Sequence, residues 1–251
     1  MIRRRKLLMR IGEVYFHDAG TMAGVDIIRY HQVRRPPGRG VSRSFSTLVI
    51  DLTQQETQLL GAVKKDCRME IRRAAREGLL YQFCFPAEAV DVDIFSDFYD
   101  RFAAQAGLPP ANRGRLRAIA ESGALDLSAS LDGDGNVLAR HAYFRAPERT
   151  RLLHSASLYR EAASAGRALI GRANRHSHWC DIIRHKNDGV LLYDFGGFYS
   201  GSADAQKIGI NHFKQEFGGR LITEFTCDVG ASVVGRMALR IRSLLGSERG
   251  I

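Results

Sequence analysis

Two helical segments, three closely spaced strands and then alternating helices and strands follow one another between Asp93 and Asp228. The clearest part is a hairpin, in which two apolar strands flank the turn Asp132-Gly-Asp-Gly-Asn136. Glycine and short polar residues supply the backbone conformations that such turns require. This order predicts an α+β fold with a mixed sheet flanked by helices. We expect strands at 125–131, 137–145, 151–159, 190–195 and 220–228, and a long helix at about 164–184.

The first 50 residues show only short strand patterns, broken by a loop rich in arginine, proline and glycine at 35–40. After them, Thr53-Gln-Gln-Glu56 has the spacing of a capping box and predicts the start of a helix that ends near Gly78. Apolar residues at helical spacing predict its buried side. These residues are Leu60, Val63, Cys67, Ile71 and Ala74.

The chain carries 37 Lys and Arg against 27 Asp and Glu, a net charge of +10. Such an excess favours a polyanionic partner, such as nucleic acid, a phosphorylated substrate or an anionic membrane surface. Part of it forms a basic face on the helix before Gly78, which suits contact with the phosphates of a tRNA. A solvated face of an amphipathic helix is the other interpretation, and both stay open. The basic residues are Lys65, Arg68, Arg72, Arg73 and Arg76.

The cysteine pattern argues against a zinc ribbon and against a disulfide framework, because the four cysteines are widely spaced and none forms a Cys-x-x-Cys pair. The basic N-terminus precedes only three apolar residues, Leu7-Leu8-Met9, which is too short for the core of a signal peptide. No stretch approaches the ~20 apolar residues of a membrane span. We therefore expect a cytoplasmic protein and leave peripheral contact with a membrane surface open.

Three blocks resemble the Fem family, which adds amino acids from aminoacyl-tRNA to peptidoglycan precursors and belongs to the GNAT acyltransferase superfold. The first joins Leu48-Val-Ile-Asp-Leu52 to the basic helix Arg68-Met-Glu-Ile-Arg-Arg-Ala-Ala-Arg-Glu-Gly78. The second is the aromatic helix 95–102 with Gly107-Leu-Pro-Pro110. The third and most specific block is Tyr193-Asp-Phe-Gly-Gly197 with Gly209-Ile-Asn-His-Phe-Lys214 and Phe217-Gly-Gly219. The resemblance covers about residues 44–228.

The resemblance implies a GNAT-like mixed sheet with a reduced N-terminal half, because Fem enzymes have two GNAT-like domains and are longer than this chain. We accordingly expect partial N-terminal strands with the basic helix in residues 1–90 and a complete GNAT-like domain in 91–230. Residues 231–251 are expected to form a C-terminal amphipathic helix.

The resemblance also implies the chemistry, an attack of an amine on an activated acyl ester or thioester. In the Fem family a lysine after a phenylalanine stabilises the oxyanion, and Phe213-Lys214 matches that pair. Asp194 is a candidate for orienting the amine or acting as a base, with a structural role in its turn slightly favoured. Tyr159 is a candidate for lining the acceptor site or donating to the leaving group, with packing as the alternative.

The loop that binds coenzyme A pyrophosphate in GNAT enzymes is poorly matched by Arg160-Glu-Ala-Ala-Ser-Ala-Gly166-Arg167. Only Gly166 and the small residues fit, although a phosphate at the N-terminus of the next helix still explains Arg160 and Arg167 as donor-binding candidates. This weak match favours aminoacyl-tRNA over acyl-CoA as the donor. Either one would be a co-substrate, and no cofactor is expected.

A histidine-rich segment, His176-Ser-His178-Trp-Cys180-Asp181 with His185, has the residue types of a metal site but lacks a second ligand pair. We therefore expect no metal and interpret these residues as packing of the long helix.

The function predicted from the sequence is amide formation with an amine acceptor, with aminoacyl-tRNA as donor. One alternative is an acyl-CoA-dependent N-acyltransferase. Another is a GNAT-like module without catalytic activity that binds RNA or a membrane.

Overall fold

We describe the protein from a computed structural model that covers residues 1–6, 8–18, 20–37, 40–160 and 162–247. Contacts divide the chain into two units, a smaller one formed by Met1–Thr47 with Ile222–Ile251 and a larger one formed by Leu48–Leu221. This division differs from the sequence-based one, because the two ends of the chain join in a single unit. Strands β4 (Val41–Asp51) and β10 (Arg220–Gly230) each have residues in both units.

The sheet of the larger unit has the strand order β4-β9-β8-β7-β6-β5. The neighbouring strands from β5 to β8 are antiparallel, whereas β8 and β9 are parallel, so the sheet is mixed as predicted. Their bounds are β5 (Leu80–Cys84), β6 (Leu125–Leu131), β7 (Val137–Arg145), β8 (Arg149–Ser157) and β9 (Leu192–Gly197).

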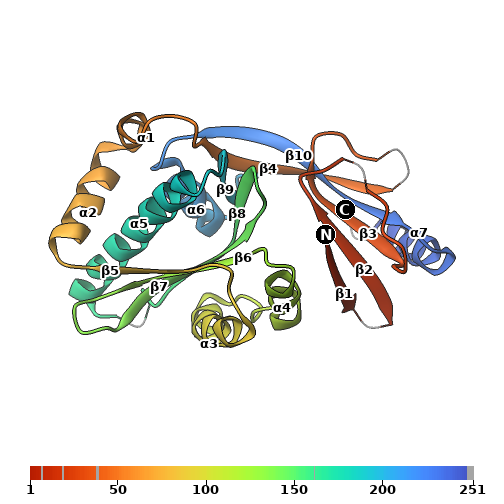
Figure 1. Cartoon of the computed structure of the whole chain (residues 1–251), viewed down its shortest axis with the longest axis horizontal. Coiled ribbons are helices and arrows are strands. Elements are labelled where there is room, and N and C mark those ends of the chain that lie inside the picture. The colour runs from red at the N-terminus through yellow and green to blue at the C-terminus, as the bar shows by residue number, and fades with distance from the viewer. Residues whose placement is uncertain (7, 19, 38–39, 161, 248–251) are drawn as a thin grey trace. The chain divides into compact units, whose positions relative to one another are not determined.

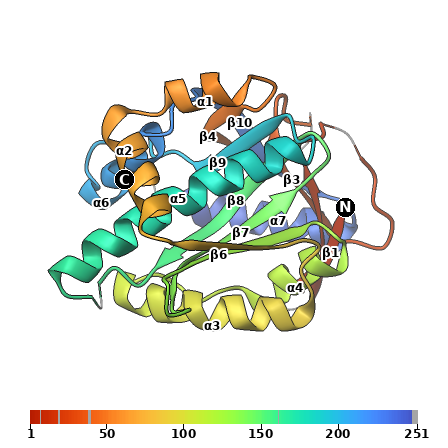
Figure 2. The same ribbon diagram turned by 60° about the vertical axis from the view of Figure 1, so that its left-hand side comes forward.

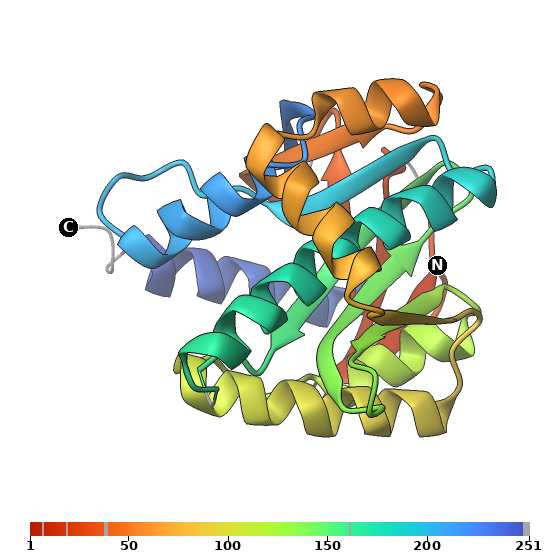
Figure 3. The same cartoon turned by 90° about the vertical axis from the view of Figure 1, so that its left-hand side faces the viewer.

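Helices cover both faces of this sheet (Figures 1 and 2). One face carries α1 (Glu56–Ala62), α2 (Lys65–Arg76) and α5 (Ser164–Asn187), and the other carries α3 (Ala89–Ala106) and α4 (Arg113–Glu121). Figure 3 shows α6 (Ala205–Gln215) following β9 on the side of α5. The predicted α+β class, with a sheet flanked by helices, is therefore confirmed.

The core of the larger unit lies between the sheet and the layer of α1, α2 and α5. Its largest members are aromatic residues from β7, β9 and the segment after α6. The expected stripe on the basic helix takes part, since Val63, Cys67 and Ile71 are buried there. Trp179 packs against the same core, as predicted for the long helix. The buried aromatic residues are Tyr143, Tyr193, Phe195 and Phe217.

The helix predicted from Thr53 to Gly78 is wrong in two respects. The capping box is formed by Gln55 and Gln58, while Thr53 hydrogen-bonds to Asp51. The segment is also two helices, because Val63 and Lys64 are extended and the Lys64 amide donates to the Glu216 carbonyl at 2.7 Å. That long-range hydrogen bond is invisible to a local pattern.

The smaller unit has the strand order β1-β2-β3-β10 and the helix α7 (Val233–Ser247). The bounds of its other strands are β1 (Ile2–Lys6), β2 (Met9–Tyr15) and β3 (Ile27–Val33), and β1 pairs with β2 in an antiparallel hairpin. β2 and β3 are parallel, and β3 is antiparallel to β10. Its core is built on Val14, Ile28, Tyr30, Val33 and Cys227.

Candidate functional site

The parallel contact between β8 and β9 is short. It comprises three residue pairs and ends where Arg151 lies opposite Asp194. β8 continues to Ser157 in register with β7. The sheet is therefore split at the carboxyl end of β9, and the resemblance to GNAT enzymes implies that the donor enters at such a split.

Lys214 lies at this split. Its side chain comes from α6 and its Nζ donates to the Gly197 carbonyl at the end of β9. α6 is fixed by Asp204, which caps its N-terminus by accepting from the Lys207 amide at 3.0 Å. Asn211 further ties α6 to the preceding loop through hydrogen bonds with the backbone of Tyr199. Lys214 is thereby held on a short, well-anchored helix.

Lys214 has an environment unlike that of a surface lysine, since only 8% of it is exposed. Burial lowers the pKa of its ammonium to about 8, although Asp194 opposes the shift, and Arg151 lowers it further. The side chain is therefore mainly charged at neutral pH but loses its proton more easily than an exposed lysine. A partly desolvated cation is a strong electrostatic partner for an oxyanion.

Asp194 is fully buried and already engaged. Its Oδ2 accepts from the Arg149 guanidinium at 2.7 Å and 3.1 Å, and its Oδ1 accepts from the Gly196 amide at 2.7 Å. Gly196 has φ +70°, and a Cβ there would lie 2.8 Å from the Leu152 carbonyl oxygen, so only glycine suits this turn. These contacts fit the structural role in its turn that the sequence slightly favoured, and a catalytic role for Asp194 stays a prediction.

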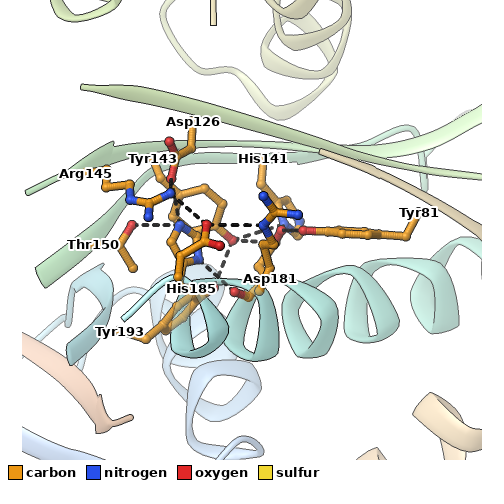
Figure 4. A network of polar contacts seen from close by, with 11 residues as sticks. Tyr81, Asp126, His141, Tyr143, Arg145, Thr150, Asp181, His185 and Tyr193 are labelled. Carbon is orange, nitrogen blue, oxygen red and sulfur yellow. Dashed lines mark hydrogen bonds and ion pairs between the residues drawn. The ribbon is translucent and has the colours of Figure 1, made fainter. Parts of the chain in front are cut away.

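A buried polar network lies within the larger unit, between α5 and strands β5, β7 and β9 (Figure 4). Asp181 on α5 is its centre and accepts from Tyr143 at 2.6 Å and from Tyr81 at 2.8 Å. His141 Nδ1 lies 2.7 Å from the same carboxylate. Burial opposes ionisation of Asp181, but the hydrogen bonds from His141 and Tyr143 outweigh it and lower the pKa of the carboxyl.

His178 joins this network to the candidate site. Its Nδ1 lies 2.9 Å from the Tyr193 hydroxyl, which is itself 2.9 Å from that of Tyr143. On its other side the His178 ring contacts the Phe213 ring, with centroids 5.5 Å apart. Burial, together with the positive charge of Lys214, lowers the pKa of His178, so its ring is neutral at neutral pH. Through His178 the network therefore contacts the residues of α6 that lie beside Lys214.

His141, His178 and Asp181 offer one potential metal-ligand atom each within 4.8 Å of one another. The segment singled out in the sequence contains His178 and Asp181, and the structure adds His141 from β7. Both ring nitrogens of His141 are engaged, one with Asp181 and the other with Asn174 at 2.8 Å. In this arrangement the histidine rings and the carboxylate are hydrogen-bonded to other protein groups.

Solved structures of known proteins share this fold. FemX matches with a TM-score of 0.61 and 13% identity over 78% of this chain and 63% of its own. The chain therefore spans less than two thirds of FemX. No protein-family model and no curated protein sequence matches the chain.

Two lysylphosphatidylglycerol synthetase structures match as well. The first is the C-terminal domain of a protein assigned as a lysylphosphatidylglycerol synthetase in Agrobacterium fabrum. It matches with a TM-score of 0.54 and 15% identity, over 91% of this chain and 76% of its own. L-PGS from Bacillus licheniformis has a TM-score of 0.53 and 13% identity, over 87% and 73%. The chain has the Fem-type fold that these structures share. The resemblance seen in the sequence is thus confirmed at the level of the fold.

The other two catalytic candidates lie apart from one another in the Fem-like fold. Phe213 is partly buried in the aromatic cluster with His178 and Phe217, under the Arg175 guanidinium 5.3 Å from its ring centre. Its contacts are those of packing that positions Lys214. Tyr159 is 47% exposed and lies in a turn beyond the end of β8, not on the strand as expected. No contact in the described part of the chain joins it to Lys214.

The donor candidates from the coenzyme A loop lie around the N-terminus of α5. No side chain of the described residues caps this end at Ala163, and the exposed Arg167 turns back to donate to the Ala162 carbonyl at 2.9 Å. The Arg160 guanidinium lies 5.9 Å from the centre of the Phe102 ring. Gly166 packs closely on Ala162, since a Cβ added to Gly166 would lie 3.1 Å from the Ala162 Cβ. These residues share one end of α5, as the sequence predicted.

The basic face of α2 is largely solvent-exposed, as expected for either interpretation. Lys65, Arg72 and Arg76 are exposed, and Arg73 is exposed but paired with Glu77 at 2.8 Å. Arg68 differs, because it donates to the Leu60 and Gly61 carbonyls at the end of α1. Arg68 therefore has a structural role that the sequence pattern did not separate from the others.

Sequence reasoning missed Arg149 and Arg151. Both lie on β8, two residues apart and so on one face of the strand. Arg149 holds Asp194, and the charge of Arg151 contributes to the lowered pKa of Lys214. Their spacing was available in the sequence, but their relevance depends on the pairing of β8 with β9.

Proposed function

We propose that this protein is an aminoacyl-tRNA-dependent aminoacyltransferase that forms an amide bond with an amine-bearing acceptor. The observation that carries the proposal is the buried Lys214 ammonium beside the split between β8 and β9, in a fold shared with FemX. Acyl transfer in general is supported by the fold. The identities of the donor and the acceptor are proposed from the basic α2 face and from the residues that match the Fem motif. A cytoplasmic location, where aminoacyl-tRNA is formed, fits the proposal.

In this reaction the acceptor nitrogen attacks the ester carbon of the aminoacyl group, and negative charge forms on the carbonyl oxygen. An ammonium has three N–H donors, and the Gly197 carbonyl takes one from Lys214. Another is then available to donate to the oxyanion. When the tetrahedral intermediate collapses, the bond to the ribose oxygen of the tRNA breaks. That oxygen gains a proton and the nitrogen loses one.

The donor is held by charge. The exposed Lys65, Arg72 and Arg76 of α2 offer sequence-independent contacts to phosphates of the tRNA. The end of α5 with Arg160 and Arg167 is a second place for phosphate, since the first-turn amides of a helix favour an anion.

The test uses tRNA charged with radiolabelled amino acids and a set of amine acceptors. The ester of aminoacyl-tRNA is cleaved by mild alkali, whereas an amide product survives it. We expect alkali-stable product with the wild-type protein and none after treatment of the donor with RNase. We expect little product with Lys214→Ala and normal product with the control Lys207→Ala, an exposed lysine on the same helix.

The same assay separates the alternatives. Transfer that resists RNase and depends on acyl-CoA would contradict the proposed donor and favour an acyl-CoA-dependent N-acyltransferase. If neither donor yields product while tRNA or vesicles still bind, the protein is a GNAT-like binding module without catalytic activity.

A further inference from the structure

The positive charge of the chain is concentrated in the smaller unit. Its sequence holds fourteen Lys and Arg against six Asp and Glu, an excess of eight out of the ten for the whole chain. The larger unit is more than twice as long, and its numbers of basic and acidic residues are nearly equal. The smaller unit therefore has a local attraction for polyanions that the total charge alone does not reveal.

Helix α7 of this unit exposes an apolar row. Val233, Met237, Ile241 and Leu244 recur at helical spacing, and their exposed fractions are 62%, 59%, 55% and 71%. The opposite side of α7 packs on the unit, because Leu239 is only 7% exposed and a Cβ at Gly235 would clash with the Asp26 carbonyl oxygen. An amphipathic helix normally turns its apolar side inward, so this row requires a partner outside the unit.

A cationic pocket of about 250 Å³ adjoins α7 within the same unit. Three guanidinium groups line it, from Arg29, Arg43 and Arg242, together with His31 and Asp228. Asp228 accepts from Arg29 at 2.6 Å and 2.8 Å and from Arg242 at 3.0 Å. The lining therefore carries three guanidinium charges and one carboxylate charge. The net positive charge suits a phosphate, which arginine binds through paired N–H donors.

Arg242 belongs to both features, since it lies on α7 and lines the pocket. We propose that the smaller unit docks on an anionic phospholipid surface, with the apolar row of α7 at the level of the acyl chains and a lipid phosphate in the arginine pocket. An apolar row beside basic residues is the pattern of helices that lie in a membrane interface. RNA binding would explain the arginines but not the exposed apolar row. Among the described residues no helix is long and apolar enough to cross a bilayer.

The test is co-flotation of the full chain with vesicles of phosphatidylcholine alone or mixed with phosphatidylglycerol. We expect binding only to the anionic vesicles and a loss of about tenfold or more in Met237→Glu with Ile241→Glu. The matched control is Val90→Glu with Ile94→Glu on α3 of the larger unit, where the wild-type side chains are 59% and 48% exposed. The control pair should bind like the wild type. Thermal melts establish that both pairs are folded.

The pocket is tested separately with Arg43→Gln, an exposed member of its lining. We expect weaker binding to anionic vesicles, and competition by soluble glycerophosphate but not by inorganic phosphate alone. Full competition by inorganic phosphate would make the pocket a free-phosphate site and overturn its assignment to a lipid.

Equal binding to neutral vesicles, or no effect of the α7 pair, would overturn the docking surface. Vesicle-independent self-association that the α7 pair abolishes would identify a second copy of the chain as the true partner. Competition of vesicle binding by tRNA, with the α7 pair behaving as wild type, would identify RNA. None of these outcomes bears on aminoacyl transfer to a water-soluble amine, which the α7 pair should leave unchanged.

Discussion

At the scale of single residues, Lys214 differs in its surroundings from the other lysines whose burial the structure describes. Burial beneath the end of β9 removes water from its ammonium, while the Gly197 carbonyl keeps one N–H engaged. Lys207, seven positions earlier on the same helix, is exposed and paired with Asp204 at 2.9 Å. The two lysines therefore form an internal comparison between a candidate catalytic group and a surface charge.

We expect Lys214→Ala to lower kcat by about 10²–10³, the usual loss when one oxyanion donor is removed. The KM for the charged tRNA should change little, because tRNA contacts are assigned to other residues. Steady-state kinetics of the amide product measures both. A kcat for Lys214→Ala close to that of Lys207→Ala would rule out the assigned role.

The lowered pKa of Lys214 predicts the pH dependence of the reaction. The ammonium is required, and it loses its proton as the pH rises through about 8 instead of near 10.5 as in an ordinary lysine. The rate should therefore fall on the alkaline side, beginning near pH 8. Lys214→Arg, if it retains activity, should extend the active range upward, because arginine stays charged. An unchanged alkaline limit in that variant would assign the titration to another group.

Asp194 predicts an effect on stability. Asp194→Asn removes the carboxylate that pairs with the buried Arg149 guanidinium, and breaking a buried ion pair costs about 3–5 kcal/mol. Thermal or urea unfolding should show the loss, while the exposed Asp134→Asn serves as a control within about 0.5 kcal/mol of the wild type. Adding Arg149→Met to Asp194→Asn should recover part of the lost stability. Wild-type stability in Asp194→Asn would contradict the structural role.

At the scale of elements, the break between α1 and α2 separates two kinds of basic residue. The Lys64 amide donates a hydrogen bond to the Glu216 carbonyl, and α1 ends before it. The Arg68 guanidinium then donates hydrogen bonds to the carbonyl groups of the last turn of α1. Beyond this point α2 presents Arg72 and Arg76 to solvent. One helix therefore carries both a structural arginine and the candidate tRNA contacts.

We expect Arg72→Glu with Arg76→Glu to weaken tRNA binding and to reduce its dependence on salt, because fewer counterions are released. Unfolding stability should stay within about 0.5 kcal/mol, since both side chains are exposed. Arg68→Ala should instead cost about 1 kcal/mol of stability, with a smaller effect on tRNA. Titrations at several salt concentrations, beside urea unfolding, measure these differences. Equal tRNA affinity in the wild type and the Arg72/Arg76 pair would leave α2 as a solvated amphipathic helix.

At the scale of the whole molecule, the two units carry different charge and different proposed partners. The larger unit holds Lys214 and the basic α2 face, and the smaller unit holds most of the excess positive charge and the exposed row of α7. The reaction and the membrane contact are thus assigned to separate units of one chain.

This separation predicts that the two binding activities are independent. Substitutions at Arg72 and Arg76 should weaken tRNA binding without changing co-flotation with anionic vesicles, and the Met237/Ile241 pair should do the reverse. Measuring both activities on both variants tests the assignment in one set of experiments. A variant that loses both activities in parallel, while folded, would show that one surface serves both partners.

The sequence by itself determined the elements that depend on local contacts. The hairpin at β6 and β7 and the end of a helix near Gly78 follow from turn chemistry and helical period, and both are present. The Fem-like motif likewise points to Lys214 from the sequence alone, since it is a match of residue types at fixed spacing.

Tertiary structure decided what depends on residues far apart in the chain. Arg149 meets Asp194 only because β8 and β9 pair in parallel, and Arg29 meets Asp228 across 199 positions because the two ends of the chain share one unit. Local periodicity specifies which side of a helix or strand is apolar, but not which distant strand lies beside it. The burial of Lys214 and the cationic pocket beside α7 are therefore properties of the fold, because each forms only when separate segments are packed together.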